Sequence, residues 1–446
     1  MPRRRWTELR RQLTIDTSPL RGSHDLRHLV LGNTITTLGS QATLVALPYQ
    51  LYVQTRSPAL TGLLGVFELA PLIVLSLYGG GLADRVDRRK LLFAVQFLIA
   101  LLTFGLAATA SLDSPPLAAL YVLGALLAGA NGMQNVTRGA IIPNVVPPEQ
   151  LRAALALVYG LTQAMMVVGP AVGGFLIAAG GVRTAYLVDA ASALLMIGTV
   201  VGLTAQLPRG ESAEEQGIWA SVAEGLRFVR SQKALVGSFA IDLSAMAFGM
   251  PRTLFPVLAL TVYHAGATGT GLLNAAVSAG AVVAALTTGW LPHVRRLGLI
   301  VIAAVIAWGA AITFAGLVPS LGLAMVMLAI AGAADSVSAV CRSAINQTVT
   351  PDHMRGRMSS VFSLVVQSGP RLGDVRSGAV ASLGSTQFAV ASGGIACVAA
   401  AVAIAFAFPS LASYDANVAE AEFAAAEAGA GAGAGDPVGE AVAQSA

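Results

Sequence analysis

The feature that most constrains this chain is a series of apolar runs, each long enough to cross a lipid bilayer as a helix. A helix rises about 1.5 Å per residue, so about 20 apolar residues span the hydrocarbon core of a membrane. Hydrophobic residues make up 55% of the chain and charged residues only 11%, a balance that soluble domains rarely show. The runs predict an all-α membrane protein with twelve transmembrane helices, over residues 27–54, 59–80, 91–112, 116–142, 151–179, 184–206, 236–262, 269–291, 298–318, 320–348, 355–383 and 386–408.

Lysine and arginine are concentrated on one side of these predicted helices. Basic residues gather before the first helix and in the loops on that same side, whereas the opposite loops contain only Arg56 and Arg183. Because cytoplasmic loops carry the excess of basic residues, both termini are expected in the cytoplasm. The sequence therefore predicts a multi-pass protein of the cytoplasmic membrane, surrounded by the lipid bilayer.

Short repeats relate the first six predicted helices to the last six. The sequence "TGLL" occurs at 61–64 and again at 270–273, and "NGMQNVTRG" (131–139) parallels "DSVSAVCRS" (335–343). A third pair, "GPAVGG" and "GPRLGD", follows in the same order along the chain. The spacings of 209, 204 and 200 residues indicate two six-helix halves that arose by parallel duplication.

The duplication, together with the polar segments, divides the chain into five predicted regions. Four hydrophobic residues of the linker, Ile218, Val222, Leu226 and Val229, recur at helical spacing, which predicts an amphipathic helix at the membrane surface. The tail is rich in Ala and Gly and is expected to be disordered. The regions are a cytoplasmic basic N-terminal arm (1–26), the N-terminal six-helix half (27–206), a cytoplasmic linker (207–235), the C-terminal six-helix half (236–408) and the cytoplasmic tail (409–446).

The polar segment between the second and third predicted helices, "GGGLADRVDRRK" (79–90), has six charged residues among its twelve. It resembles the signature loop of the major facilitator superfamily, Gly-x-x-x-Asp-Arg-x-Gly-Arg-Arg, except that Asp87 replaces the second glycine. "VGPAVGGFL" (168–176), "PRTLFPVLA" and "GGVRTAYLVDAAS" resemble exporters of that superfamily, in particular the enterobactin exporter family and related siderophore and drug efflux transporters. The resemblance covers roughly residues 24–408 and implies two pseudo-symmetric six-helix halves. The matching loop residues are Gly80, Asp84, Arg85, Arg88 and Arg89.

The resemblance implies that this loop is part of a gate. In the family, the loop aspartate docks on the start of helix 11 when the cytoplasmic face closes, so Asp84 would accept hydrogen bonds from backbone N–H groups there. Arg88 would pair with a nearby carboxylate. The alternative is that the basic residues of the loop only fix the orientation of the chain in the membrane.

Polar side chains near the middle of the predicted helices form a second group of candidates, because ionisable residues in the hydrocarbon region are costly. In the resembling fold, helices 1, 4, 7 and 10 line a cavity, while helices 2 and 11 face each other across the halves. This arrangement would bring Glu68 towards Arg371. The substrate-cavity candidates are Asn131, Gln134, Arg252, Arg342 and Arg371.

Proton coupling requires a carboxylate whose pKa differs between the inward-open and outward-open states, as burial allows. The candidates for this role are Glu68, Asp335 and Asp374. The alternative is a fixed structural ion pair, for example between Asp335 and Arg371. Arg138, near the end of its helix, is expected to extend its charge to the membrane interface.

The favoured function is proton-coupled export of a small amphipathic molecule, with a siderophore as the leading candidate and protons as the coupling ion. A broad-specificity multidrug efflux pump is the main alternative, and a non-transporting membrane sensor or scaffold is a third. The sequence contains no Gly-x-x-x-x-Gly-Lys-Ser/Thr loop and no His/Cys cluster with metal-ligand spacing. We therefore expect a monomeric transporter rather than an enzyme, without cofactor, metal or nucleic-acid partner.

Overall fold

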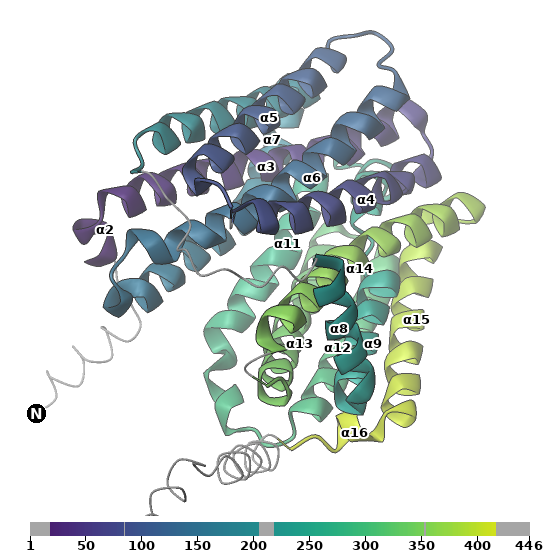
Figure 1. The fold of residues 1–446 in the computed structure, drawn as a ribbon. Coiled ribbons are helices and arrows are strands. Elements are labelled where there is room, and N and C mark those ends of the chain that lie inside the picture. The colour runs from purple at the N-terminus through teal and green to yellow at the C-terminus, as the bar shows by residue number, and fades with distance from the viewer. Residues whose placement is uncertain (1–17, 84, 205–217, 352–353, 416–446) are drawn as a thin grey trace, which may run out of the picture.

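The computed structural model describes residues 18–83, 85–204, 218–351 and 354–415 (Figure 1). Nearly all of these residues are helical and none of them forms a strand, which confirms the predicted all-α class. The first half contains α2 (Ser18–Gly22), α3 (His24–Thr55), α4 (Pro58–Ala83), α5 (Arg88–Thr109), α6 (Leu117–Val145), η1 (Pro148–Gln150) and α7 (Leu151–Val201). The linker and second half contain α8 (Ile218–Ser231), α9 (Lys233–Gly249), η2 (Arg252–Leu254), α10 (Phe255–Val257), η3 (Leu258–Val262), α11 (Gly266–Thr287), η4 (Thr288–His293), α12 (Leu297–Leu317), α13 (Leu321–Val349), α14 (Arg355–Leu383), α15 (Thr386–Ala407) and α16 (Pro409–Ala412).

Helix α7 consists of two helical arms that meet at Gly181, where the chain reverses direction with backbone angles of φ 77° and ψ 173°. Its first arm runs parallel to α3 and its second arm runs back along α3. In the second arm, Tyr186 donates to Gln50 and Asp189 accepts from Thr43, so higher numbers in α7 meet lower numbers in α3. A glycine is needed at the reversal because a side chain disfavours a positive φ. The two arms correspond to the fifth and sixth predicted helices.

Nine helical segments of the described chain are long and apolar enough to cross a membrane. One of them, Pro148–Val201, has 54 residues and includes both arms of α7. At about 1.5 Å per residue this segment is more than twice as long as the hydrocarbon core is thick. Helices α3 and α14, with 32 and 29 residues, are more polar but long enough to span. If both arms of α7 are counted separately and α3 and α14 are added, the described chain has twelve possible transmembrane helices. That all twelve cross the membrane stays a prediction.

The seventh predicted helix is interrupted inside the membrane region. α9 ends at Gly249, and Met250 and Pro251 have non-helical backbone angles before η2, α10 and the π-helical η3 continue the span. Proline lacks the N–H that would continue the helical ladder, so Pro251 contributes to an interruption that the predicted helix 236–262 did not include. Broken helices are tolerated at membrane depth where other protein groups or a cavity satisfy the freed backbone.

The helices form two bundles, α3–α7 and α9–α15, which are seen as the upper and lower groups in Figure 1. Their buried apolar residues form largely separate clusters. The bundles meet where α4 packs on α14 and where α7 packs on α11. Gly62 lies against Gly378, and Gly271 lies against Gly174, so closely that an added Cβ would be 3.0 and 2.9 Å from the facing Cα. Both "TGLL" copies therefore supply the glycine of an equivalent contact, in agreement with the repeat.

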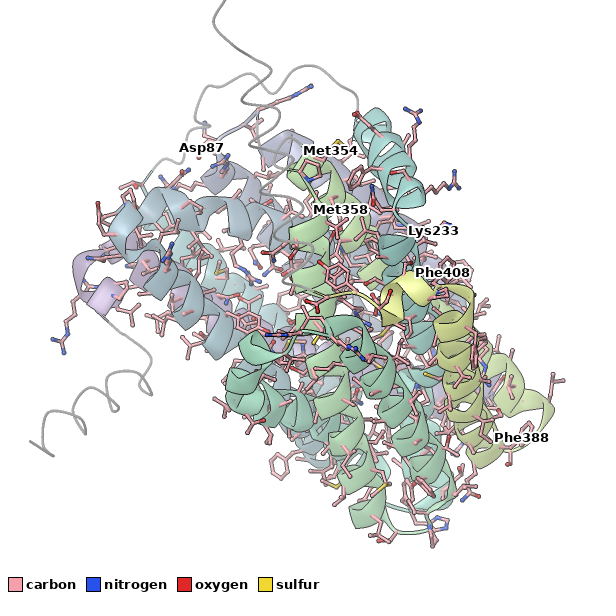
Figure 2. All side chains as sticks on the ribbon, turned by 90° about the horizontal axis from the view of Figure 1, so that it is seen from below. Asp87, Lys233, Met354, Met358, Phe388 and Phe408 are labelled. Carbon is pink, nitrogen blue, oxygen red and sulfur yellow. The ribbon has the colours of Figure 1, made fainter. Side chains whose placement is uncertain are left out.

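Helix α8 lies in the predicted linker and packs against α14 and α9. Its Val229 is buried in the apolar cluster of the second half. The first turns of α9, which begin at Lys233, pack against Phe408 and Leu411 at the end of the second half (Figure 2). α8 therefore fixes the linker to the second half.

Candidate substrate cavity and charged sites

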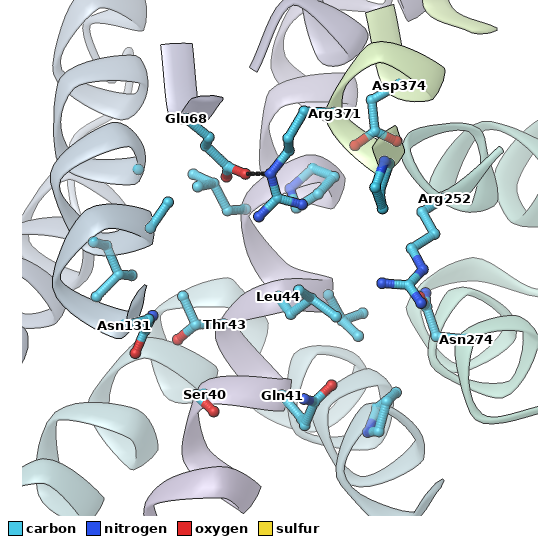
Figure 3. Close-up of a pocket in the computed structure, with 18 of the residues that line it drawn as sticks. Ser40, Gln41, Thr43, Leu44, Glu68, Asn131, Arg252, Asn274, Arg371 and Asp374 are labelled. Atoms are coloured by element: carbon cyan, nitrogen blue, oxygen red, sulfur yellow. Dashed lines mark ion pairs between the residues drawn. The ribbon is translucent and has the colours of Figure 1, made fainter. Parts of the chain in front are cut away.

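A cavity of about 470 Å³ lies between the two halves (Figure 3). Helices α3, α4, α6 and α7 line one side, and η2, α10, α11 and α14 line the other. The rest of the lining mixes amide, hydroxyl and apolar side chains, as is typical of small-molecule sites. Among the described residues, the charged side chains of the lining are Glu68, Arg138, Arg252, Arg371 and Asp374.

Glu68 and Arg371 form an ion pair that joins α4 of the first half to α14 of the second (Figure 3). The distance from Arg371 Nε to Glu68 Oε2 is 2.8 Å. Gly65, one turn before Glu68, permits this approach because a Cβ there would lie 2.7 Å from the Arg371 carbonyl oxygen. The expected proximity of Glu68 and Arg371 is confirmed. The role of Glu68 as proton carrier stays a prediction.

Asp374 lies on α14 and supports the interruption of the seventh helix. Its Oδ1 accepts a hydrogen bond of 3.3 Å from the backbone N–H of Thr253, one of the groups that the break leaves without a helical partner. Arg252 precedes Thr253 and lines the cavity beside Asn274 (Figure 3). The break in the helix therefore places Arg252 in the cavity, as predicted, and gives Asp374 a structural contact.

Arg342 lies on α13 in a buried cluster of charges within the second half. Its Nη1 is 2.6 Å from Asp242 Oδ1 on α9, and its Nη2 is 3.7 Å from Asp335 Oδ1 on α13. Neither Arg342 nor Asp335 is among the residues that line the cavity. The prediction that Arg342 is a cavity residue is wrong, because this face of α13 turns towards α9. The alternative pair of Asp335 with Arg371 is also wrong, since Arg342 and Glu68 are the respective partners.

The middle of α6 contributes the amide side chains of the cavity. Asn131 and Gln134 line it, as predicted. Arg138, two turns further along α6, also lines it and does not extend to the membrane interface, so that expectation is wrong. The guanidinium donates from Nη1 to Asn33 Oδ1 on α3, and from Nη2 to Asn135 Oδ1 at 2.9 Å. Asn33, which lies on another helix, and Asn135, one turn earlier on α6, hold Arg138 inward.

Asp189, on the second arm of α7, is a buried carboxylate that the sequence interpretation did not select. It is 1% exposed and accepts a hydrogen bond of 2.6 Å from Thr43 Oγ1, with Ser192 Oγ at 3.4 Å. Elsewhere on α3, threonine hydroxyls such as those of Thr36 and Thr37 donate to the carbonyl four residues earlier. Thr43 departs from that pattern and is itself part of the cavity lining. The sequence interpretation missed Asp189 because its partner Thr43 is 146 residues away in the chain.

The signature loop connects three helix ends of the first half. Arg88 Nε donates to the carbonyl of Ala83 at 3.0 Å, and its Nη1 donates to Ala140 of α6 at 3.0 Å. Asp87 caps α5 with a φ of −57°, so the position does not need the glycine that the family pattern has there. Close packing at the end of α4 falls on Gly79, against Met133, rather than on Gly80.

Arg89 donates hydrogen bonds to backbone carbonyls of α7, as Arg88 does to those of α4 and α6. Its Nε and Nη2 donate to the carbonyls of Val200 and Val201, at 3.2 and 2.6 Å. Unsatisfied carbonyls at a helix C-terminus favour such a cation. Asp84 lies outside the described residues, and so do residues 352 and 353 at the predicted docking point. Arg85, the next residue in the chain, is in a turn. The gate and the pairing of Arg88 with a carboxylate stay predictions.

Among the described residues, Met166 is the one methionine that lines the cavity. Met246 and Met250 are buried in the core of the second half. The cavity is therefore polar and charged rather than rich in methionine. Within the described ranges, no three His, Cys, Asp or Glu side chains are grouped so that they could hold a metal ion.

The two bundles and the cavity between them define a transporter of the major facilitator type. Solved structures agree: the nucleoside transporter NupG superposes with a TM-score of 0.68 at 14% identity, covering 88% of this chain and 100% of that chain. A bacterial homologue of the lysosomal transporter Spinster, solved in an inward-facing and unoccupied conformation, gives 0.65 at 16% identity, covering 91% and 99%. At these identities the likeness shows the fold.

The sequence itself matches the family described as transmembrane secretion effector over residues 15–428, and the chain belongs to this family of the major facilitator superfamily. The enterobactin exporter EntS of Citrobacter koseri is 32% identical over 354 residues, which are 79% of this chain and 83% of the relative. EntS of Shigella boydii serotype 4 is 32% identical over 332 residues, 74% of this chain and 78% of the relative. The family and these relatives are membrane transporters, not enzymes.

Proposed function

We propose that this protein is a proton-coupled exporter that moves a small acidic, amphipathic molecule across the cytoplasmic membrane. The leading candidate is a siderophore of the enterobactin class. The observation that carries the proposal is the charge of the cavity, where three arginines stand against two carboxylates among the described residues. Guanidinium groups bind paired anionic oxygens in a planar, bidentate fashion, which suits catecholate and carboxylate groups. The enterobactin exporters at 32% identity support the same cargo class.

The ion pair between Glu68 and Arg371 supports proton coupling. Protonation of Glu68 would remove the negative charge and with it the attraction that joins α4 to α14. A proton taken up at Glu68 would then favour states in which the two halves separate at this point. The partners described for Asp374 and Asp335, the other candidates, are Thr253 and Arg342 of the same half, whereas the partner of Glu68 lies in the opposite half. We therefore place Glu68 first.

The signature loop is proposed to close the cytoplasmic face. The contacts at Gly62–Gly378 lie near the start of α4, and the loop lies after its end, so the halves touch far from the loop. This arrangement fits a state that is open towards the cytoplasm. Asp84→Ala is expected to slow transport while membrane insertion is retained, as measured by uptake into vesicles with matched protein content. Transport at the wild-type rate would remove Asp84 from the gate.

The apolar part of the lining, which includes Leu44, Phe255 and Met166, favours a broad-specificity multidrug efflux pump as the second candidate. Such a pump would accept neutral and cationic compounds as well as acids. A sensor or scaffold has no specific observation in its favour.

The test is metabolite profiling of a deletion strain, combined with transport in inside-out vesicles under an imposed pH gradient. We expect the deletion strain to retain a siderophore inside the cell, and the vesicles to accumulate enterobactin only when their interior is acidic. Unchanged siderophore secretion, together with gradient-driven uptake of cationic dyes, would favour multidrug efflux instead.

A further inference from the structure

Arg138 lines the cavity, and Arg342 occupies the equivalent position in the other half. Arg138 and Arg342 are 204 residues apart, as the repeats that contain them are. Their partners on the first helix of each half, Asn33 and Asp242, are 209 residues apart, as the two "TGLL" copies are. The two contacts, α6 to α3 and α13 to α9, are therefore equivalent.

The partners differ in charge. Asp242 carries a carboxylate and neutralises Arg342, whereas Asn33 offers Arg138 a neutral amide oxygen. Asn135, the second partner of Arg138, is also an amide. Among the described residues, no ion pair joins Arg138 to a carboxylate. Its positive charge is oriented by hydrogen bonds but is not compensated.

Arg138 also retains unused hydrogen-bonding capacity. A guanidinium has five N–H donors in a fixed plane, and the two hydrogen bonds that the structure describes for Arg138 go to Asn33 and Asn135. Arg138 is half-buried and lines the cavity, as the polar side chains of Asn131 and Thr162 also do. By contrast, Arg371 is already paired with Glu68.

A charge of this kind has a physical cost that an anion would remove. Arg138 lies seven residues from Asn131 along α6, about 10 Å from the middle of the helix at 1.5 Å per residue. At that depth an unpaired cation is unfavourable unless water or an anion reaches it. If Arg138 served only to clamp α6 to α3, an aspartate at position 33 would do so better, as Asp242 does in the second half.

We infer that Arg138, oriented by Asn33 and Asn135, is the group of the cavity that binds the acidic part of the cargo and selects anions over neutral molecules of the same shape. The ligand is a deprotonated oxygen pair, such as that of a catecholate or an aromatic carboxylate. This inference rests on the proposed function, because it assigns the acidic cargo to one side chain.

The test uses Asn33→Asp, which hardly changes side-chain size and gives Arg138 the carboxylate that Arg342 has. The probes are 2,3-dihydroxybenzoate and its neutral analogue 2,3-dihydroxybenzamide, and dissociation constants are measured by calorimetry on purified protein in phosphatidylcholine nanodiscs. We expect Asn33→Asp to weaken binding of the acid by about 10- to 100-fold, the value of one charge-assisted interaction, and to change binding of the amide less than about twofold. Arg138→Gln should give the same pattern.

The matched control is Asn274→Asp, which adds a negative charge to the same cavity beside Arg252 rather than Arg138 (Figure 3). We expect a much smaller loss of acid binding in this variant. Equal losses in the two variants would overturn the inference, because the effect would then come from total charge. A wild type that binds the amide as tightly as the acid would overturn it too.

Two further results separate this inference from the proposals on which it rests. If wild-type vesicles transport enterobactin and Asn33→Asp vesicles transport it equally well, the inference fails while the proposed export stands. If enterobactin is not transported, the proposed cargo fails, and the probe pair still decides the role of Arg138. If phosphatidylglycerol in place of phosphatidylcholine abolishes acid binding by the wild type but leaves the weaker binding by Arg138→Gln unchanged, Arg138 binds a lipid headgroup, and its role in cargo selection is overturned.

Discussion

The two halves of this transporter use an equivalent arginine in different ways. In the second half, Arg342 is buried and pairs with Asp242 at 2.6 Å, with Asp335 close by. In the first half, Arg138 has amide partners and faces the cavity. A duplicated framework therefore holds one neutralised charge, which binds helices together, and one uncompensated charge.

The partner of each arginine, rather than the arginine itself, therefore decides whether the arginine binds helices together or keeps a free charge. An asparagine and an aspartate have almost the same shape, and the exchange of an amide for a carboxylate changes the charge of the contact from +1 to zero. The exchange is repeated nearby, since Asn131 of the first half corresponds to Asp335 of the second in the repeat.

Asp242→Asn would make the second half resemble the first, and we expect the largest loss of stability from it. Arg342 would remain buried with only Asp335 at 3.7 Å as a charged partner. Breaking a buried pair typically costs about 3–5 kcal/mol. The measurement is the thermal unfolding midpoint of the purified protein in detergent, with Asn33→Asp as the matched variant in the first half. Equal midpoints for wild type and Asp242→Asn would show that the pair does not stabilise the second half.

Glu68→Gln removes the charge of the pair that crosses the two halves while it keeps the size of the side chain. We expect uptake into inside-out vesicles to lose its dependence on the pH gradient, and cargo binding to be retained. Binding of the acidic probe and gradient-driven uptake are measured on the same preparations. A normal response to the gradient would move the proton site elsewhere, and Asp335→Asn would be the next variant.

Arg89→Ala tests the loop as a connection between helix ends within the first half. It removes two hydrogen bonds to the C-terminal carbonyls of α7, at Val200 and Val201. Because these contacts are partly exposed, we expect a loss of about 1–2 kcal/mol in unfolding free energy. Unfolding in denaturant measures it, with Lys90→Ala as a control in the same turn. No difference between the two variants would contradict the contact.

Asp189→Asn is expected to have the smallest effect on stability, although Asp189 is as deeply buried as Asp242. The partners of Asp189 are the hydroxyls of Thr43 and Ser192, which can reorient to serve an amide. We expect less than about 1 kcal/mol. A midpoint lowered as far as in Asp242→Asn would mean that a cation compensates Asp189. Hydroxyl groups would then not be its main partners.

The helices and the duplication could be predicted from the sequence because they depend on local patterns. Apolar length predicts spans, and the "TGLL" copies predict equivalent helices, whose glycines indeed occupy equivalent contacts between the halves. The approach of Glu68 to Arg371 followed once helices 2 and 11 were expected to face each other. These statements need only helix order and depth.

The failures concern rotation of a helix about its own axis. Depth along α13 placed Arg342 near the substrate, but the side that it occupies faces α9 and Asp242. Arg138 was expected at the membrane interface because it lies near the end of its helix, and its partner Asn33, 105 residues away in sequence, became visible only in the structure. The repeat spacing relates Arg138 to Arg342 and Asn33 to Asp242, but the contact within each half is given only by the structure.

A structure of the protein with an acidic cargo bound tests the contrast between the halves most directly. We expect the anionic oxygens of the cargo to lie within hydrogen-bonding distance of the Arg138 guanidinium, while Arg342 keeps its contact with Asp242. An acidic group that binds at Arg252 or Arg371, with Arg138 still joined only to Asn33 and Asn135, would contradict it.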